Sequence, residues 1–196
     1  MYINKSIILT LPIIILLLLG INSNSNEIEE PINKLIVREK KQSIRIVLSW
    51  GKKPKNLDAH LWFKDIHLFY NGINGRRSGL YSSIDRDDID SYGPETLTIS
   101  QVVAGEKYIY AVHDYTNKTN IHSKQLSFSD ARIYIYKYYS NKPIKIYYIP
   151  RNKTGNIWFV FYIDERGDFI EINKFYSTNS DSGDILPILI ENNQQK

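Results

Sequence analysis

Residues Leu57 to Phe63 read LDAHLWF, and this stretch decides the fold class. Apolar side chains stand at every second position: Leu57, Ala59, Leu61 and Phe63. The side chains between them are those of Asp58, His60 and Trp62. Because successive side chains of a β-strand point to opposite faces, this alternation predicts a strand with one apolar face in a core and one polar face turned outward.

Similar runs, rich in Ile, Val, Tyr, Phe and Trp, follow one another from residue 43 onward. We expect strands at Ile44 to Trp50, Leu57 to Phe63, Ile66 to Tyr70, Glu95 to Ser100, Lys107 to Asp114, Ala131 to Tyr139, Ile144 to Ile149, Ile157 to Ile163 and Phe169 to Ile172. Turn-forming clusters separate the runs, and no later stretch keeps the 3.6-residue period of a helix. The sequence therefore predicts an all-β fold, an antiparallel β-sandwich of immunoglobulin-like or jelly-roll-like kind with about 8–9 strands. The run Ile157 to Ile163 is apolar on both faces, which predicts a strand covered on both sides.

The composition limits the classes of site that this chain can carry. Its 196 residues are 42% hydrophobic, enough for one sizeable core. With no cysteine, the chain has no disulfide, no thiol nucleophile and no cysteine-based metal site. A net charge of +4 is spread over a mixed surface of 25 basic and 21 acidic residues, so we expect no nucleic-acid partner.

The N-terminal region has the pattern of an export signal. Lys5 precedes an apolar run from Ile7 to Ile21, and a polar stretch follows at once. We interpret 1–25 as a signal peptide, either cleaved or kept as an uncleaved anchor, and 26–42 as a charged linker. The β-sandwich domain is expected at 43–175 and a mobile tail at 176–196. The mature chain would then be secreted or periplasmic, without a membrane span.

An acidic segment from Asp85 to Glu95 places five carboxylates in eleven residues beside a Gly-Pro turn. Crowded carboxylates repel one another, and a calcium ion takes several oxygen ligands from such a loop. The predicted calcium ligands are Asp58, Asp85, Asp87, Asp88 and Glu95. The spacing is not that of an EF-hand, and the alternative is that these side chains cap turns and pair with Lys or Arg.

Histidines are the next candidates for chemistry. His60 and His113 lie in predicted strands and, with Asp58, would suit zinc, which with an open position could support hydrolysis. The alternative is that each imidazole makes a structural hydrogen bond, because the close histidine spacings of zinc enzymes are absent. Trp62 and Tyr92 are expected as neighbours of a ligand site. The other two histidines, His67 and His122, are expected on the surface.

Tyrosines offer a possible carbohydrate site. Tyr134, Tyr136 and Tyr138 share one face of a predicted strand, and an exposed aromatic row can stack on sugar rings or seat a partner protein. The alternative is that these tyrosines fill a half-buried face of a sheet.

The order of several motifs resembles the YfaP-type family of secreted bacterial proteins. The motifs are Ile46-Val47-Leu48-Ser49-Trp50, Asn56-Leu57-Asp58-Ala59-His60-Leu61, Asp85 to Thr96, Gly105-Glu106-Lys107-Tyr108 and Val112-His113-Asp114-Tyr115. The resemblance covers residues 43 to 172 and implies an extracytoplasmic β-sandwich whose biochemical role is uncharacterised.

No nucleophile turn or phosphate loop occurs in the sequence. We therefore expect a binding module rather than an enzyme, with an envelope or extracellular protein or a glycan as partner.

Overall fold

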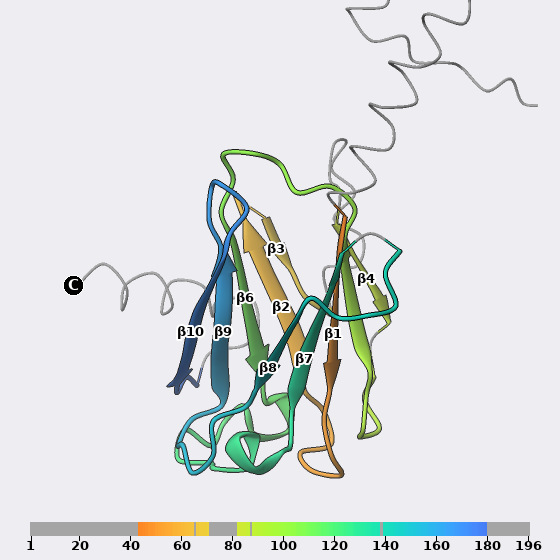
Figure 1. Ribbon diagram of the computed structural model, residues 1–196. Helices are drawn as coiled ribbons and strands as arrows, with labels where there is room; N and C mark the ends of the chain where they lie inside the picture. The colour runs from red at the N-terminus through yellow and green to blue at the C-terminus, as the bar shows by residue number, and fades with distance from the viewer. Residues whose placement is uncertain (1–42, 65, 71–81, 87, 138, 180–196) are drawn as a thin grey trace, which may run out of the picture. The chain divides into compact units, whose positions relative to one another are not determined.

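The computed structural model describes residues 43–64, 66–70, 82–86, 88–137 and 139–179. This part of the chain forms ten strands and two short 3-10 turns, η2 (Tyr115–Asn117) and η3 (Leu126–Phe128). The strands form two antiparallel sheets of five (Figure 1). The predicted antiparallel β-sandwich is therefore confirmed.

The first sheet has the order β4-β5-β1-β7-β8. Its strands are β4 (Ser82–Arg86), β5 (Glu95–Ile99), β1 (Ile44–Ser49), β7 (Arg132–Lys137) and β8 (Lys145–Tyr148). β1 lies at the centre, where Ile46 pairs with Leu97 on one side and with Ile135 on the other. These three side chains are almost fully buried, because the apolar residues of the three strands face the same side of the sheet.

The second sheet has the order β10-β9-β6-β2-β3. Its strands are β10 (Phe169–Tyr176), β9 (Ile157–Ile163), β6 (Tyr108–His113), β2 (Asp58–Phe63) and β3 (Ile66–Leu68). β2 lies between β6 and the short edge strand β3. All six residues of β2 are buried. They include Asp58 and His60, which the alternation predicted to face outward.

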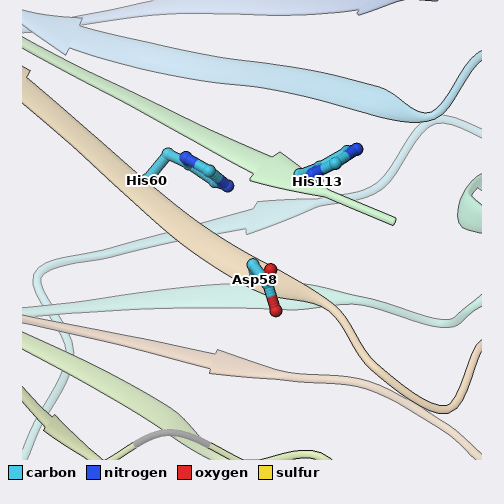
Figure 2. Close-up of side chains that lie close together, drawn as sticks. All are labelled: Asp58, His60 and His113. Atoms are coloured by element: carbon cyan, nitrogen blue, oxygen red, sulfur yellow. The ribbon is translucent and has the colours of Figure 1, made fainter. Parts of the chain in front are cut away.

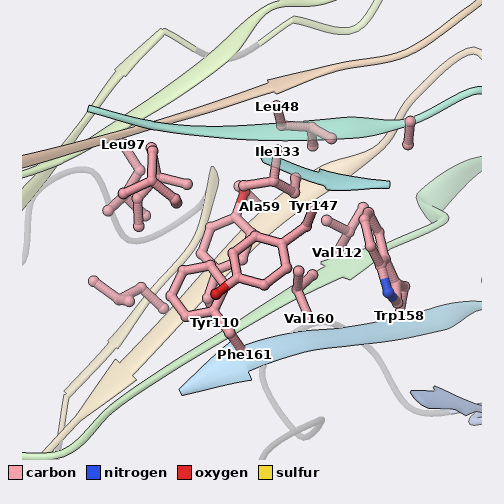
Figure 3. Packing of buried hydrophobic residues seen from close by; sticks show 14 of the residues in the cluster. Leu48, Ala59, Leu97, Tyr110, Val112, Ile133, Tyr147, Trp158, Val160 and Phe161 are labelled. Carbon is pink, nitrogen blue, oxygen red and sulfur yellow. The ribbon is translucent and has the colours of Figure 1, made fainter. Parts of the chain in front are cut away.

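The main core lies between the two sheets. Leu57, Ala59, Leu61 and Phe63, the alternating residues that predicted β2, all belong to it. Phe161 of β9 stacks on Tyr110 of β6 and on Tyr147 of the opposite sheet, with ring centroids 5.2 and 5.0 Å apart (Figure 3). Burying each large side chain contributes about 1.5–3 kcal/mol, so this aromatic stack is a main source of sheet-on-sheet stability.

A second, smaller cluster lies on the outer face of the second sheet, meaning the face turned away from the first sheet. Its buried members are Trp62, Ala111, Ile157 and Phe159. β9 thus has buried side chains on both faces, as its doubly apolar sequence predicts. The residues of β2 that the sequence placed on an outward face are consequently not exposed to water.

Two strands differ from expectation. β4 is not among the strands expected from the sequence, because its residues, SSIDR, have no apolar alternation. Pairing with β5 at the sheet edge makes it a strand, and polar side chains are usual on such edges. β10 continues past Ile172 to Tyr176, since a register shift between Glu171 and Lys174 breaks the period-two pattern that a sequence reading follows.

No helix in the described ranges is long and apolar enough to cross a membrane. The predicted signal peptide, the linker and the tail beyond residue 179 lie outside the described residues, and their assignments stay predictions.

Candidate functional site

The acidic segment is described only in part. Asp87 and the side chain of Asp85 lie outside the described residues, although the backbone of Asp85 belongs to β4. Asp88 is half-buried, and its Oδ1 accepts a hydrogen bond from the backbone N–H of Asp90 at 3.1 Å. That contact is the turn-capping alternative expected for such residues. Calcium binding by the whole segment stays a prediction.

Glu95 has a defined structural position at the start of β5. Its side chain is 2% exposed, and Oε2 accepts a hydrogen bond from the backbone N–H of Ala59 at 2.6 Å. The turn before it needs Gly93, which has φ +68°, and a Cβ there would lie 2.8 Å from the ring of Trp50. Glu95 therefore joins the first sheet to β2, the strand that carries Asp58.

Three potential metal ligands converge on the outer face of the second sheet. Asp58 and His60 stand two residues apart on β2, and His113 is the register partner of Asp58 on β6. One ligand atom from each residue lies within 4.8 Å of the other two, and the side chains gather on one face (Figure 2). The residues are 1%, 0% and 0% exposed, respectively. Asp88 and Glu95 are not members of this group.

The period of the strand and the register of the sheet explain this convergence. Leu57, Ala59 and Leu61 enter the main core, so Asp58 and His60 must face outward. In antiparallel pairs, residues directly opposite have their Cβ atoms about 4.5–5.5 Å apart, which brings His113 beside Asp58. Neighbouring Trp62 and Ala111 belong to the outer apolar cluster, and the three side chains of the group are themselves at most 1% exposed.

His60 is neutral and has one ring nitrogen available. Burial, with smaller contributions from the nearby His67 and His113, holds the pKa of His60 well below its ordinary value. Nδ1 lies 2.9 Å from Nε2 of His67. Nε2 is buried and has no hydrogen-bond partner within the described ranges. A neutral imidazole with an uncompensated nitrogen is the form in which histidine binds a metal ion.

The donor set selects among metal ions. Two imidazoles and one carboxylate suit zinc and related first-row metals, whereas calcium prefers six to eight oxygen ligands. Donor atoms around a tetrahedral zinc with bonds of about 2.0–2.1 Å lie about 3.3 Å apart. The observed separations, all within 4.8 Å, are wider than this, so the side chains would have to move closer together to bind an ion.

His67 was expected on the surface, yet it is half-buried and contacts His60. β3 pairs antiparallel with β2, and His67 is the register partner of Trp62. The expected strands Leu57 to Phe63 and Ile66 to Tyr70 are only two residues apart, which is the spacing of a hairpin, and a hairpin would have placed His67 beside the cluster.

The two expected neighbours of the site have different positions. Trp62 lies on the same face as His60, and their rings stack with centroids 5.4 Å apart. Tyr92 is 61% exposed, and its backbone N–H bonds to the carbonyl of Gly51 in the turn before Gly93.

The tyrosines of β7 lie on the outer face of the first sheet. Tyr134 and Tyr136 are half-buried, and Tyr138 lies outside the described residues. Tyr148 of the neighbouring strand β8 is 60% exposed. The guanidinium of Arg45 lies 4.8 Å from the ring centroid of Tyr136, and that of Arg132 lies 5.8 Å from Tyr148. The outer face of the first sheet therefore carries half-buried and exposed tyrosine rings, with arginine side chains beside two of them.

Comparisons with models of protein families, with curated proteins and with solved structures find no match for this chain. The resemblance to the YfaP-type family stays a prediction, and the site is interpreted from its own geometry.

Proposed function

We propose that this protein is an extracytoplasmic β-sandwich binding module that holds a zinc ion with Asp58, His60 and His113. The observation that carries this proposal is the convergence of the three ligand atoms within 4.8 Å in a buried position. Export is supported by the apolar run from Ile7 to Ile21 behind Lys5. The metal would stabilise the second sheet by linking β2 to β6.

Burial favours a structural zinc over a hydrolytic one. A catalytic zinc keeps an open coordination position that water and substrate can reach. Asp58, His60 and His113 supply three of the four ligands of a tetrahedral zinc. Because each of them is at most 1% exposed, the fourth position has little access to a substrate in this conformation. A structural ion also compensates for a module outside the cell that has no cysteine to form disulfides.

Titration calorimetry with zinc tests the proposal directly. The metal-free wild-type chain should bind one zinc ion, and His60→Ala should abolish the heat of binding. His122→Ala is the matched control, because it removes an exposed imidazole from a turn. Zinc binding that survives in His60→Ala would place the metal elsewhere and refute the assignment.

Calcium is the second arm of the same titration. If the acidic segment binds calcium as the sequence predicts, calcium should bind equally to the wild-type chain and to His60→Ala. Zinc and calcium would then occupy separate sites. If only zinc binds, the carboxylates of the segment act through turns and ion pairs instead.

Carbohydrate binding is a second candidate function, favoured by the exposure of Tyr148 beside Arg132. Trp62, Ala111, Ile157 and Phe159 on the outer face of the second sheet are buried, whereas Tyr148 on the outer face of the first sheet is 60% exposed and can be reached by a flat partner. Affinity electrophoresis in gels that contain soluble polysaccharides tests it. Retardation that disappears in Tyr148→Ala supports the candidate, and unchanged migration in every gel removes it.

A further inference from the structure

His67 contacts the proposed metal centre without belonging to its ligand group. It lies on the edge strand β3, and its Nε2 is 2.9 Å from Nδ1 of His60. Nδ1 is the ring nitrogen of His60 that already has a partner, whereas Nε2 has none in the described part of the chain. The contact between the two imidazoles therefore involves the nitrogen that would not bind the ion.

Ring contacts hold His67 in place. Its imidazole stacks on Trp62 with ring centroids 4.5 Å apart and on Phe69 with centroids 4.4 Å apart. The interplanar angles are 16° and 23°. Two stacked neighbours restrict the rotation of the ring and so favour the observed orientation, in which Nε2 of His67 lies 2.9 Å from Nδ1 of His60.

The position of the ring proton of His60 determines which of its nitrogens can bind a metal ion. In a hydrogen bond between two neutral imidazoles, one of the two facing nitrogens carries the proton and the other accepts it. If His60 binds zinc through Nε2, that atom must offer a lone pair, so the ring proton must reside on Nδ1. Nδ1–H then donates to Nε2 of His67, and His67 carries its own proton on Nδ1.

We propose that His67 is a positioning residue of the metal centre: it accepts the Nδ1 proton of His60 and so keeps Nε2 of His60 directed at the ion as a lone-pair donor. This inference rests on the proposed zinc site. Histidine ligands in metal sites usually donate their second ring N–H to a carboxylate, a carbonyl or water. An imidazole acceptor serves the same purpose here, and it makes His67 important for affinity although it does not touch the metal.

Two substitutions separate this role from simple packing. His67→Phe keeps a flat ring to stack on Trp62 and Phe69 but has no acceptor. His67→Gln loses the ring, but its Oε1 can accept the proton of His60. If His67 positions His60, the Phe variant should bind zinc about 10–100-fold more weakly than wild type, and the Gln variant should recover most of that loss. If His67 only packs, the order of the two variants should be reversed, and the inference would be overturned.

Nitrogen-15 NMR of the metal-free chain gives a readout that does not depend on zinc. The wild-type chain and His67→Gln should show His60 as the Nδ1–H tautomer, and a dominant Nε2–H tautomer in the wild type would overturn the inference. His60→Ala separates failure of the proposed zinc site from failure of the role assigned to His67. Undiminished zinc binding in His60→Ala defeats the proposed function, whereas loss in His60→Ala with normal binding in His67→Phe defeats the role of His67 alone.

Discussion

Zinc should raise the melting temperature of this protein, and His60→Ala should remove the effect. An ion that binds the folded chain but not the unfolded chain stabilises the fold by RT ln(1 + [L]/Kd). The ligand atoms come from two strands and meet only through the pairing of β2 with β6, so the unfolded chain has no preformed site. The stabilisation therefore reports directly on the assembled cluster.

The expected shift follows from the size of the folded unit. At a zinc concentration 100 times Kd, the stabilisation is about 2.7 kcal/mol. Near the midpoint, the free energy of unfolding of a β-sandwich of about 130 residues falls by about 0.27 kcal/mol per kelvin, which is its entropy of unfolding. Dividing the first quantity by the second predicts an increase in Tm of about 10 °C.

Circular dichroism at a β-sheet wavelength measures the shift. The wild-type chain is melted with a chelator, with zinc and with calcium, at equal ionic strength. His122→Ala should keep the full response to zinc, because the substituted imidazole is exposed. Equal melting of the wild-type chain with zinc and with chelator would refute the metal centre. An equal shift in His60→Ala would show that the ion acts at a different place.

The other predictions concern the structure around the site. Glu95→Ala should lower the free energy of unfolding by about 1–3 kcal/mol in chemical denaturation, because it leaves a buried backbone N–H of β2 without its 2.6 Å acceptor; an unchanged midpoint would show that this bond contributes nothing. Gly93→Ala should cost more than Gly105→Ala in the same assay. Both have positive φ, but only at Gly93 would a Cβ lie 2.8 Å from Trp50, while at Gly105 nothing lies within 4 Å; equal costs would contradict the steric argument. Burial raises the pKa of Asp114 from 3.8 to about 6, so the folded chain holds this proton more tightly than the unfolded chain. Stability from this group is fully present below about pH 4 and is lost as the pH rises through 6, by about 3 kcal/mol in total. Stability curves of the wild type and Asp114→Asn, measured by urea unfolding across this range, should diverge by that amount, and parallel curves would count against the shift.

Local pattern in the sequence was sufficient for the fold class. Period-two alternation is a property of single strands, so LDAHLWF shows by itself that Asp58 and His60 share a face and that Leu61 belongs to the core. The doubly apolar run of β9 is likewise confirmed as a strand buried on both faces. β4 was missed because its pairing with β5, rather than its own side chains, makes it a strand.

Tertiary structure decided which residues meet. Strand register placed His113 opposite Asp58, and nothing in either strand alone encodes that pairing across more than fifty residues of chain. The outer apolar cluster made an outward face a buried one, and the hairpin of β2 and β3 brought His67 to His60. Glu95, which the sequence predicted as a calcium ligand together with Asp58, faces the main core from the opposite sheet. The physical reason is that a side chain's face depends on neighbours one or two residues away, whereas register and layer depend on contacts between distant segments, which form only when the whole sandwich folds.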